Sequence, residues 1–245
     1  VRVLGVMSLS CAIWGALIYP WHPQLLSVVL VGYAALVLYR PTVWLVVLPA
    51  ALPLLDLTPY SGWQLLTEFD LLVAATLGAL WLKGIGAPGA LGLDRVGAAG
   101  LIIFAVLVTA GAVAALIPFR VPEPTDLASY LSEFNALRVG KGCVTGVLLW
   151  LAYVQVRGRD RGRAELAFLF GVSIGLLATG FVAMWERGVF GALLHDGLTG
   201  ALSTLLNFAG SYRITGLFSG MHTGGTSIDG YLVLAIPMAA AGLAM

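Results

Sequence analysis

Long runs of apolar residues recur along the chain and set the strongest limit on its fold. They lie at about residues 3–19, 24–39, 43–57, 69–82, 96–117, 139–156, 165–185 and 227–245. A helix needs roughly 17–25 mostly apolar residues to cross the hydrocarbon of a bilayer, and these runs approach or reach that length. The pattern predicts an all-α, polytopic transmembrane helical bundle with about eight spans, forming a single domain over residues 1–245.

The composition agrees with this fold class. Hydrophobic residues make up 60% of the 245 residues and charged residues 10%, whereas a soluble domain carries about 25% charged residues. The formal net charge of +1 provides no field that would attract nucleic acid, so no nucleic-acid partner is expected. Cys11 and Cys143 fall within apolar runs, where cysteine behaves as a small hydrophobic residue. With no metal-binding spacing in the sequence, neither a metal nor another cofactor is expected.

Basic residues indicate how the spans are oriented. The stretch Arg157-Gly-Arg-Asp-Arg-Gly-Arg163 follows the sixth run, and the positive-inside rule places it in the cytoplasm. Alternation from that point puts the N-terminus in the cytoplasm as well, and each short inside loop then carries a basic residue. The sequence therefore predicts a multi-pass protein of the inner (cytoplasmic) membrane, with the segment 186–226 in the periplasm.

The outside segment combines an amphipathic stretch with a polar one. Over residues 189–208, leucine and phenylalanine recur at helical spacing, while His195 and Asp196 are among the polar residues that lie mostly elsewhere on the helical wheel. This pattern is typical of a helix at the membrane interface, which could wall a groove or serve as a connector that binds nothing. Residues 211–229 then gather an arginine, a histidine, an aspartate and several glycines between two apolar segments. In so apolar a chain, this polar stretch is the candidate functional site.

Arg213 is the leading candidate residue in that stretch. It lies next to the last apolar run on the outside, where ionisable groups normally face a polar cavity or a partner. A guanidinium can hold phosphate oxygens through two parallel hydrogen bonds, and glycines such as Gly216 let backbone N–H groups approach the same ligand. The alternative from the residues alone is that Arg213 pairs with Asp229 or Asp196, or reaches the lipid headgroups.

Other polar residues on the outside extend the candidate binding site. Arg138 and Lys141 begin the sixth run one helical turn apart, and they either add a second contact to an anion or anchor the helix at the interface. Glu68 and Asp70 open the fourth run, where acidic residues favour the N-terminus of a helix. His222 could act as a base near neutral pH, or it could hydrogen-bond within its own loop.

The stretch Arg213-Ile-Thr-Gly-Leu-Phe218, followed by small residues and by Tyr231-Leu-Val-Leu-Ala-Ile-Pro-Met238, resembles a known motif. It is similar to the arginine motif that opens the shared domain of the O-antigen ligase and O-antigen polymerase family. The resemblance implies a metal-independent membrane glycosyltransferase, which transfers a glycan from an undecaprenyl-pyrophosphate carrier to a lipid or glycan acceptor on the periplasmic side. It also implies that Arg213 contacts the donor pyrophosphate. Family members continue with further spans and a periplasmic histidine, so this chain is expected to be an N-terminal portion whose catalytic base lies beyond Met245.

Two other classes of function stay open on the sequence. A polysaccharide transporter or flippase-like protein commonly shows internal repeats and charges near the middle of its helices. Here the charges lie at the ends of the apolar runs and no repeat is visible, which argues against this class. A non-enzymatic assembly subunit would need only an apolar surface, and the sequence does not exclude it.

Overall fold

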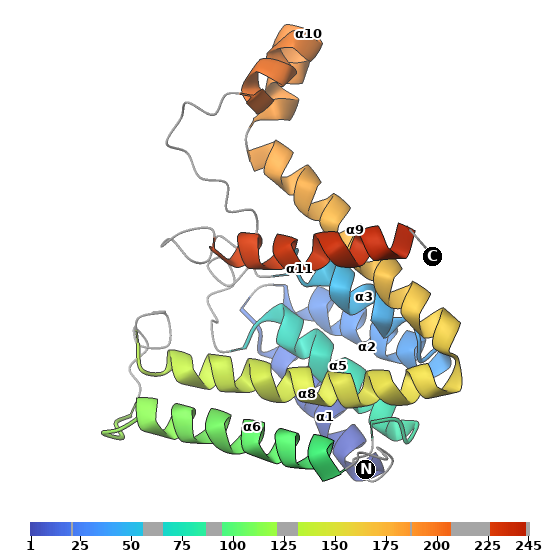
Figure 1. Cartoon of the computed structure of the whole chain (residues 1–245), viewed down its shortest axis with the longest axis vertical. Coiled ribbons are helices and arrows are strands. Elements are labelled where there is room, and N and C mark those ends of the chain that lie inside the picture. The colour runs from blue at the N-terminus through green and yellow to red at the C-terminus, as the bar shows by residue number, and fades with distance from the viewer. Residues whose placement is uncertain are drawn as a thin grey trace. The chain divides into compact units, whose positions relative to one another are not determined.

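The computed structural model describes residues 1–20, 22–55, 66–86, 95–121, 132–186, 188–206 and 226–243. Within these residues the chain forms nine α-helices and no strand, so the predicted all-α class is confirmed (Figure 1). The helices are α1 (Arg2–Leu17), α2 (Pro23–Tyr39), α3 (Trp44–Ala51), α5 (Glu68–Leu82), α6 (Arg95–Ala115), α8 (Asn135–Arg159), α9 (Arg161–Glu186), α10 (Val189–Leu206) and α11 (Thr226–Leu243). Each apolar run contains one helix, and α10 occupies the predicted amphipathic stretch.

The lengths of the helices do not support the predicted count of eight spans. In the described part of the chain, two helices are long and apolar enough to cross a membrane, at Asn135–Arg159 and Arg161–Trp185. Helices α1, α2 and α5 have 16, 17 and 15 residues, and a helix needs about 20 residues to span the hydrocarbon at a rise of about 1.5 Å per residue. Helix α3 ends after eight residues, shortly before Pro53. A proline ring clashes with the carbonyl four residues earlier, so it breaks the apolar run predicted at 43–57.

Contacts between residues divide the chain into two compact units. The first unit comprises Val1–Trp44 and Tyr60–Glu165, and the second comprises Leu45–Pro59 and Leu166–Met245. Each unit is described by itself below. The single domain expected over residues 1–245 stays a prediction.

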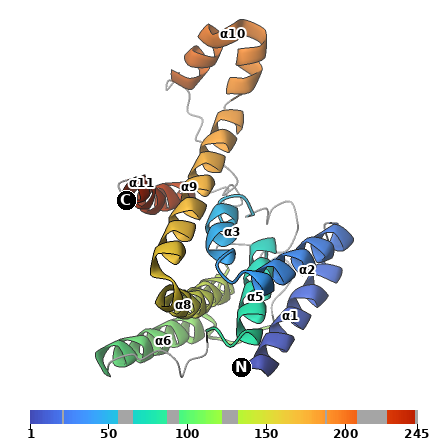
Figure 2. The same ribbon diagram turned by 90° about the vertical axis from the view of Figure 1, so that its right-hand side faces the viewer.

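Helix α5 forms the centre of the first unit. Most of its residues are buried, and it packs against α1, α2 and α8 (Figure 2). The crossing with α1 depends on glycine, because a Cβ added to Gly78 would lie 2.9 Å from the Leu9 nitrogen and 3.0 Å from the Gly5 oxygen. At the other end of α1, a Cβ on Gly15 would lie 2.8 Å from the Leu71 side chain. The start of α1 therefore meets the end of α5, and the two helices run in opposite directions.

Helices α5 and α8 run in the same direction, because contacts join them at both ends. Near their first turns, Lys141 of α8 pairs with Asp70 of α5. Just after the end of α5, the Gly86 backbone N–H donates a hydrogen bond to the side-chain oxygen of Gln155, near the end of α8, at 2.7 Å. Helix α6 packs on α8, and Gly140 at the start of α8 lies beside Ala112 near the end of α6. Helices α6 and α8 are therefore antiparallel.

In the second unit, glycines of α9 receive the backbone of α3. A Cβ on Gly171 would lie 2.5 Å from the Val46 carbonyl oxygen, and a Cβ on Gly175 would lie 2.8 Å from that of Pro49. The order of these contacts makes α3 and α9 parallel, and the small residues permit the close approach that small-x-x-x-small pairs allow. A Cβ on Gly175 would also lie 2.5 Å from the Tyr231 hydroxyl of α11. Farther along α11, Gly242 meets Leu169, so α11 and α9 are antiparallel.

Helix α10 confirms the helix predicted over 189–208 and adds a bend to it. Gly197 interrupts the helical backbone with φ 66° and ψ −159°, a conformation that side chains other than glycine rarely adopt. Large apolar residues on both sides of the bend are exposed, including Leu194 and Leu198. Polar residues such as His195 and Asp196 are exposed as well.

Candidate functional site

The structure describes part of the predicted site. Arg213, Gly216 and His222 lie outside the described residues, and their roles stay predictions. Arg138 and Lys141 are described, and both lie in the first two turns of α8. The geometry of the site is therefore built from the neighbouring ends of α5 and α8.

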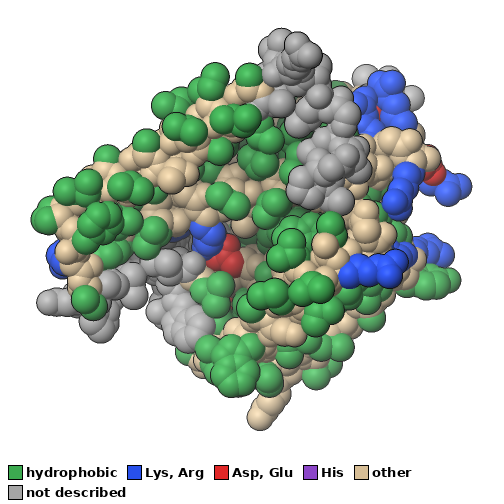
Figure 3. Space-filling view, turned by 90° about the horizontal axis from the view of Figure 1, so that it is seen from below, with side chains coloured by type: hydrophobic (Ala, Val, Ile, Leu, Met, Phe, Trp, Pro, Cys, Tyr) green, Lys and Arg blue, Asp and Glu red, His purple; other side chains and the backbone are tan. Residues whose placement is uncertain are grey.

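Asp70 of α5, the N-cap residue Thr67 and Lys141 of α8 are joined by polar contacts, and we call them the α5–α8 polar cluster. Its central contact is the ion pair in which the Lys141 ammonium donates to Oδ2 of Asp70. The two side chains are 28% and 16% exposed, so solvent and salt screen their attraction less than they would at an open surface. Figure 3 shows an acidic and a basic side chain side by side near hydrophobic ones, with further basic side chains toward one edge of the face.

Asp70 also closes the N-terminus of α5. The Thr67 backbone N–H donates to Oδ2 of Asp70 at 2.8 Å, and the Asp70 backbone N–H donates to Oγ1 of Thr67 at 3.3 Å. This reciprocal arrangement is a capping box, which satisfies N–H groups that have no partner inside the helix. It confirms the helix-capping role predicted for acidic residues at this position. The same carboxylate oxygen thus serves both the cap and the pair with Lys141.

Glu68, the other acidic residue at this terminus, does not share that role. Its side chain is buried, with the residue 4% exposed, and neither carboxylate oxygen has a hydrogen-bond partner among the described residues. A buried polar group in this condition is uncommon, because removing it from water without a compensating hydrogen bond costs free energy. From the sequence alone, Glu68 and Asp70 had the same interpretation, as acidic residues that favour the start of a helix. Their positions in the first turn give them different roles. Asp70 is the third residue of the helix, the position that completes a capping box, whereas Glu68 is the first.

Arg138 and Lys141 lie three residues apart, so they share one face of α8 as the sequence predicts. Both side chains are partly buried. The structure adds that an acidic residue of α5, Asp70, pairs with Lys141. An anion that binds Lys141 must therefore compete with Asp70, which the sequence alone did not indicate.

At the other end of α8, the arginine cluster packs around an acidic residue. Arg157 and Arg161 donate to Oε1 of Glu165 at 2.7 and 3.1 Å. Arg163 pairs with Asp160 at 3.4 Å. The contacts made by Arg157 and Arg163 join residues on the two sides of the turn between α8 and α9, so these arginines, which indicated orientation, also stabilise this turn.

The described site can offer cations to an anion and carboxylates to hydroxyl groups. In the described ranges, no three His, Cys, Asp or Glu side chains are grouped so that they could hold a metal ion. Arg138 and Lys141 can donate hydrogen bonds to phosphate oxygens, whereas the Glu68 carboxylate is buried. Comparison of the chain with known protein families, with curated proteins and with solved structures finds no match.

Proposed function

We propose that the chain is part of a glycosyltransferase of the inner membrane, similar to the O-antigen ligases and polymerases. It transfers a glycan from an undecaprenyl-pyrophosphate carrier to a lipid or glycan acceptor on the periplasmic side. The reaction class rests on the motif at residues 213–218 and the apolar run after it. The proposed location in a membrane rests on one structural observation, which is that α8 and α9, the longest apolar helices of the described part of the chain, are largely exposed.

Helices α8 and α9 are exposed in a way that favours hydrocarbon as their surroundings. In the apolar 18-residue stretch of each helix, 17% of the stretch is buried in α8 and 22% in α9. The core helix of a soluble protein is mostly buried. The shorter helices α1 and α2 also expose large side chains, such as Trp14 and Val28. Apolar surfaces of this extent mark contact with a membrane or with another protein. In the proposal, α1, α2, α6 and α11 also lie within the bilayer, which can thin locally around short helices.

The proposed chemistry is the electrostatic stabilisation of a leaving group. As the acceptor hydroxyl attacks the anomeric carbon, the bond to the carrier breaks and negative charge builds up on the departing pyrophosphate. Arg213 neutralises that charge with help from the Gly216 backbone. Arg138 and Lys141 supply a second pair of cations at the outer end of α8, and His222 hydrogen-bonds the donor.

Substitution of Arg213 tests the proposal in the whole protein. Arg213→Ala should abolish glycan transfer in native membranes without lowering the amount of inserted protein. Arg213→Lys should retain a small part of the activity, because lysine keeps the charge but loses the two-pronged hydrogen bonding. Arg187→Ala removes another predicted outside charge and serves as the matched control, with activity unchanged. Full transfer activity in Arg213→Ala would overturn the proposal.

A further inference from the structure

Four exposed basic residues gather at one end of the first unit, and the proposed reaction uses none of them. They are Arg2 at the start of α1, Arg40 after α2, Lys83 after α5 and Arg159 at the end of α8, and we call them the basic end. None of the four forms an ion pair with an acidic residue in the described part of the chain. Basic side chains gather toward one edge of the face shown in Figure 3.

The packing of α1 on α5 brings the first two of these residues together. A Cβ added to Gly5 of α1 would lie 2.9 Å from the Leu82 backbone nitrogen at the end of α5. Arg2 lies three positions before Gly5, and Lys83 directly follows Leu82. Arg2 and Lys83 therefore lie at the same end of this helix pair.

Helix α2 brings Arg40 to the same end. It follows α1 after a short connection and packs beside it, so it runs against α1 and in the same direction as α5 (Figure 2). The hydroxyl oxygens of Tyr33 in α2 and Thr76 in α5 lie 2.7 Å apart. Arg40 and Lys83 follow these residues by seven positions each, which is about 10 Å along each helix.

Helix α8 adds Arg159 to the group. The hydrogen bond from the Gly86 backbone N–H to the Gln155 side chain joins the end of α8 to the residues after α5. Arg159 lies four positions beyond Gln155, and Lys83 lies three positions before Gly86.

The arginines beside the basic end do not cancel its charge. Arg157 and Arg161 share Glu165, and Arg163 pairs with Asp160. These three cations meet two carboxylates, so they add to the positive charge of the four residues without an acidic partner. The field at this end of the unit is therefore positive over the described residues.

Apolar side chains are exposed directly beside these cations. Val3 and Val6, which follow Arg2 in α1, are 72% and 55% exposed. Tyr39 is 76% exposed, and the Arg40 guanidinium lies 5.8 Å from the centre of its ring. An aromatic ring beside a basic residue is typical of the boundary between hydrocarbon and headgroups.

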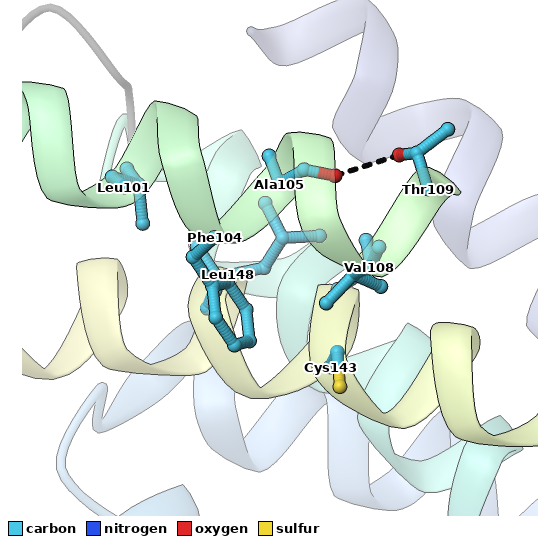
Figure 4. Close-up of a pocket in the computed structure, with 9 residues that line it drawn as sticks. Leu101, Phe104, Ala105, Val108, Thr109, Cys143 and Leu148 are labelled. Atoms are coloured by element: carbon cyan, nitrogen blue, oxygen red, sulfur yellow. Dashed lines mark hydrogen bonds between the residues drawn. The ribbon is translucent and has the colours of Figure 1, made fainter. Parts of the chain in front are cut away.

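The side of the unit between α6 and α8 is apolar as well. Leu101 and Phe104 of α6, with Leu148 of α8, line a groove there (Figure 4). The Thr109 hydroxyl in this lining donates a hydrogen bond to the Ala105 carbonyl oxygen of its own helix, at 2.8 Å. Hydrocarbon therefore suits the sides of the unit, and a layer of anionic groups suits its basic end.

We propose that the basic end binds the phosphate headgroups of anionic phospholipids in the cytoplasmic leaflet. The inference rests on the membrane location in the proposed function, but it does not depend on glycan transfer. Basic segments beside membrane helices attract anionic headgroups, which lie where the hydrocarbon ends. A nucleic acid or an acidic protein would pair with the cations but would leave the neighbouring apolar side chains in water.

Removal of three cations from the full chain tests the proposal. The protein is purified in a neutral detergent, and native mass spectrometry measures the phosphatidylglycerol and phosphatidylcholine that it retains from an equal mixture. The triple variant Arg40→Gln, Lys83→Gln, Arg159→Gln removes the charges, whereas the double variant Arg40→Lys, Arg159→Lys keeps them. Arg120→Gln is the matched control, because it removes an exposed cation beyond the other end of α6.

Phosphatidylglycerol should be retained in preference to phosphatidylcholine. A basic residue near anionic lipid strengthens binding by about fivefold, so the triple variant should retain phosphatidylglycerol at least about tenfold more weakly. The lysine variant and Arg120→Gln should bind it as the unaltered chain does. Thermal unfolding in detergent establishes that all three variants are folded.

Equal retention of phosphatidylglycerol by the triple variant and Arg120→Gln would overturn the proposal. Equal retention of the two lipids by the unaltered chain would do the same. Binding of single-stranded RNA in place of phosphatidylglycerol, lost in the triple variant, would assign the cations to another partner and also overturn it. Release of the chain from native membranes by alkaline carbonate would remove the membrane location itself, whereas failure of the lipid test in a membrane-embedded chain removes this inference alone.

Discussion

The contact between Asp70 and Lys141 should contribute measurably to the free energy of unfolding, because it joins the first turns of α5 and α8. Asp70 has two roles, since its carboxylate also closes the capping box with Thr67. Three substitutions separate these roles. Thr67→Ala removes one side of the cap, Lys141→Met removes the cation, and Asp70→Asn removes the charge while keeping a side-chain oxygen that can accept hydrogen bonds.

Each role has an expected magnitude. Loss of a capping side chain typically costs about 1 kcal/mol, which is the value expected for Thr67→Ala. The pair is 28% and 16% exposed, so it should exceed an open surface pair, worth about 0.2–1 kcal/mol. Hydrogen-bond pairs measured in a membrane protein reach at most about 1.7 kcal/mol. We therefore expect a coupling energy of about 1–1.5 kcal/mol between Asp70 and Lys141.

A double-mutant cycle measures this coupling. Unfolding is followed by circular dichroism in mixed micelles of a mild detergent and increasing sodium dodecyl sulfate. The cycle uses Asp70→Asn, Lys141→Met and the double variant, and a parallel cycle pairs Thr67→Ala with Lys141→Met. The first cycle should give about 1–1.5 kcal/mol, and the second should give less, because Thr67 contacts the carboxylate rather than the ammonium. A coupling energy below about 0.3 kcal/mol in the first cycle would refute the reasoning, since that is the size of ordinary non-additivity.

Two further predictions concern packing inside the units. Gly171→Ala should destabilise the protein by about 2 kcal/mol, because its Cβ would lie 2.5 Å from the Val46 carbonyl oxygen. A Cβ added to Gly142 would have no other atom within 4 Å of it. Gly142→Ala should therefore be neutral or should stabilise the helix by up to about 1 kcal/mol in the same unfolding assay. Because the Thr76 hydroxyl donates to the Leu72 carbonyl oxygen at 2.8 Å, we assign the Tyr33 hydroxyl as the donor of the 2.7 Å bond to Oγ1 of Thr76. Tyr33→Phe should therefore cost about 1 kcal/mol, because Thr76 keeps its bond to the Leu72 carbonyl. Thr76→Val should cost more, about 1–3 kcal/mol, because it leaves the buried Tyr33 hydroxyl without this partner, and equal costs would contradict the assigned direction of the bond.

The positions of the helices could be predicted from the sequence, but several of their lengths could not. An apolar run shows which residues avoid water, and helices formed in each such run. The ends of a helix depend instead on caps and on prolines. The run at 24–39 became a helix over Pro23–Tyr39, whereas the run at 43–57 yielded only Trp44–Ala51. Pro49 and Pro53 both lie in this run, and the helix ended between them.

The local part of the candidate site could be predicted, and the long-range part could not. Capping at the start of α5 depends on residues three positions apart, so the acidic residues there indicated it. The pairing of Asp70 with Lys141 joins residues 71 positions apart, and it depends on how α5 packs on α8. Two pairs of glycines with the same spacing illustrate the same limit. Gly171 and Gly175 receive the backbone of α3. A Cβ added to Gly142 or Gly146 would have no other atom within 4 Å.

The directions of the helices connect the observed packing with the proposed location in a membrane. Helices that follow one another across a bilayer alternate in direction, so spans that pack side by side are often antiparallel. In the first unit, α1 and α6 oppose α5 and α8, and in the second unit α9 runs with α3 and against α11. A soluble bundle with short loops can alternate in the same way, so direction alone does not identify the solvent. The proposed bilayer would cover the large apolar surface that these helices leave exposed and that a soluble bundle would have to bury.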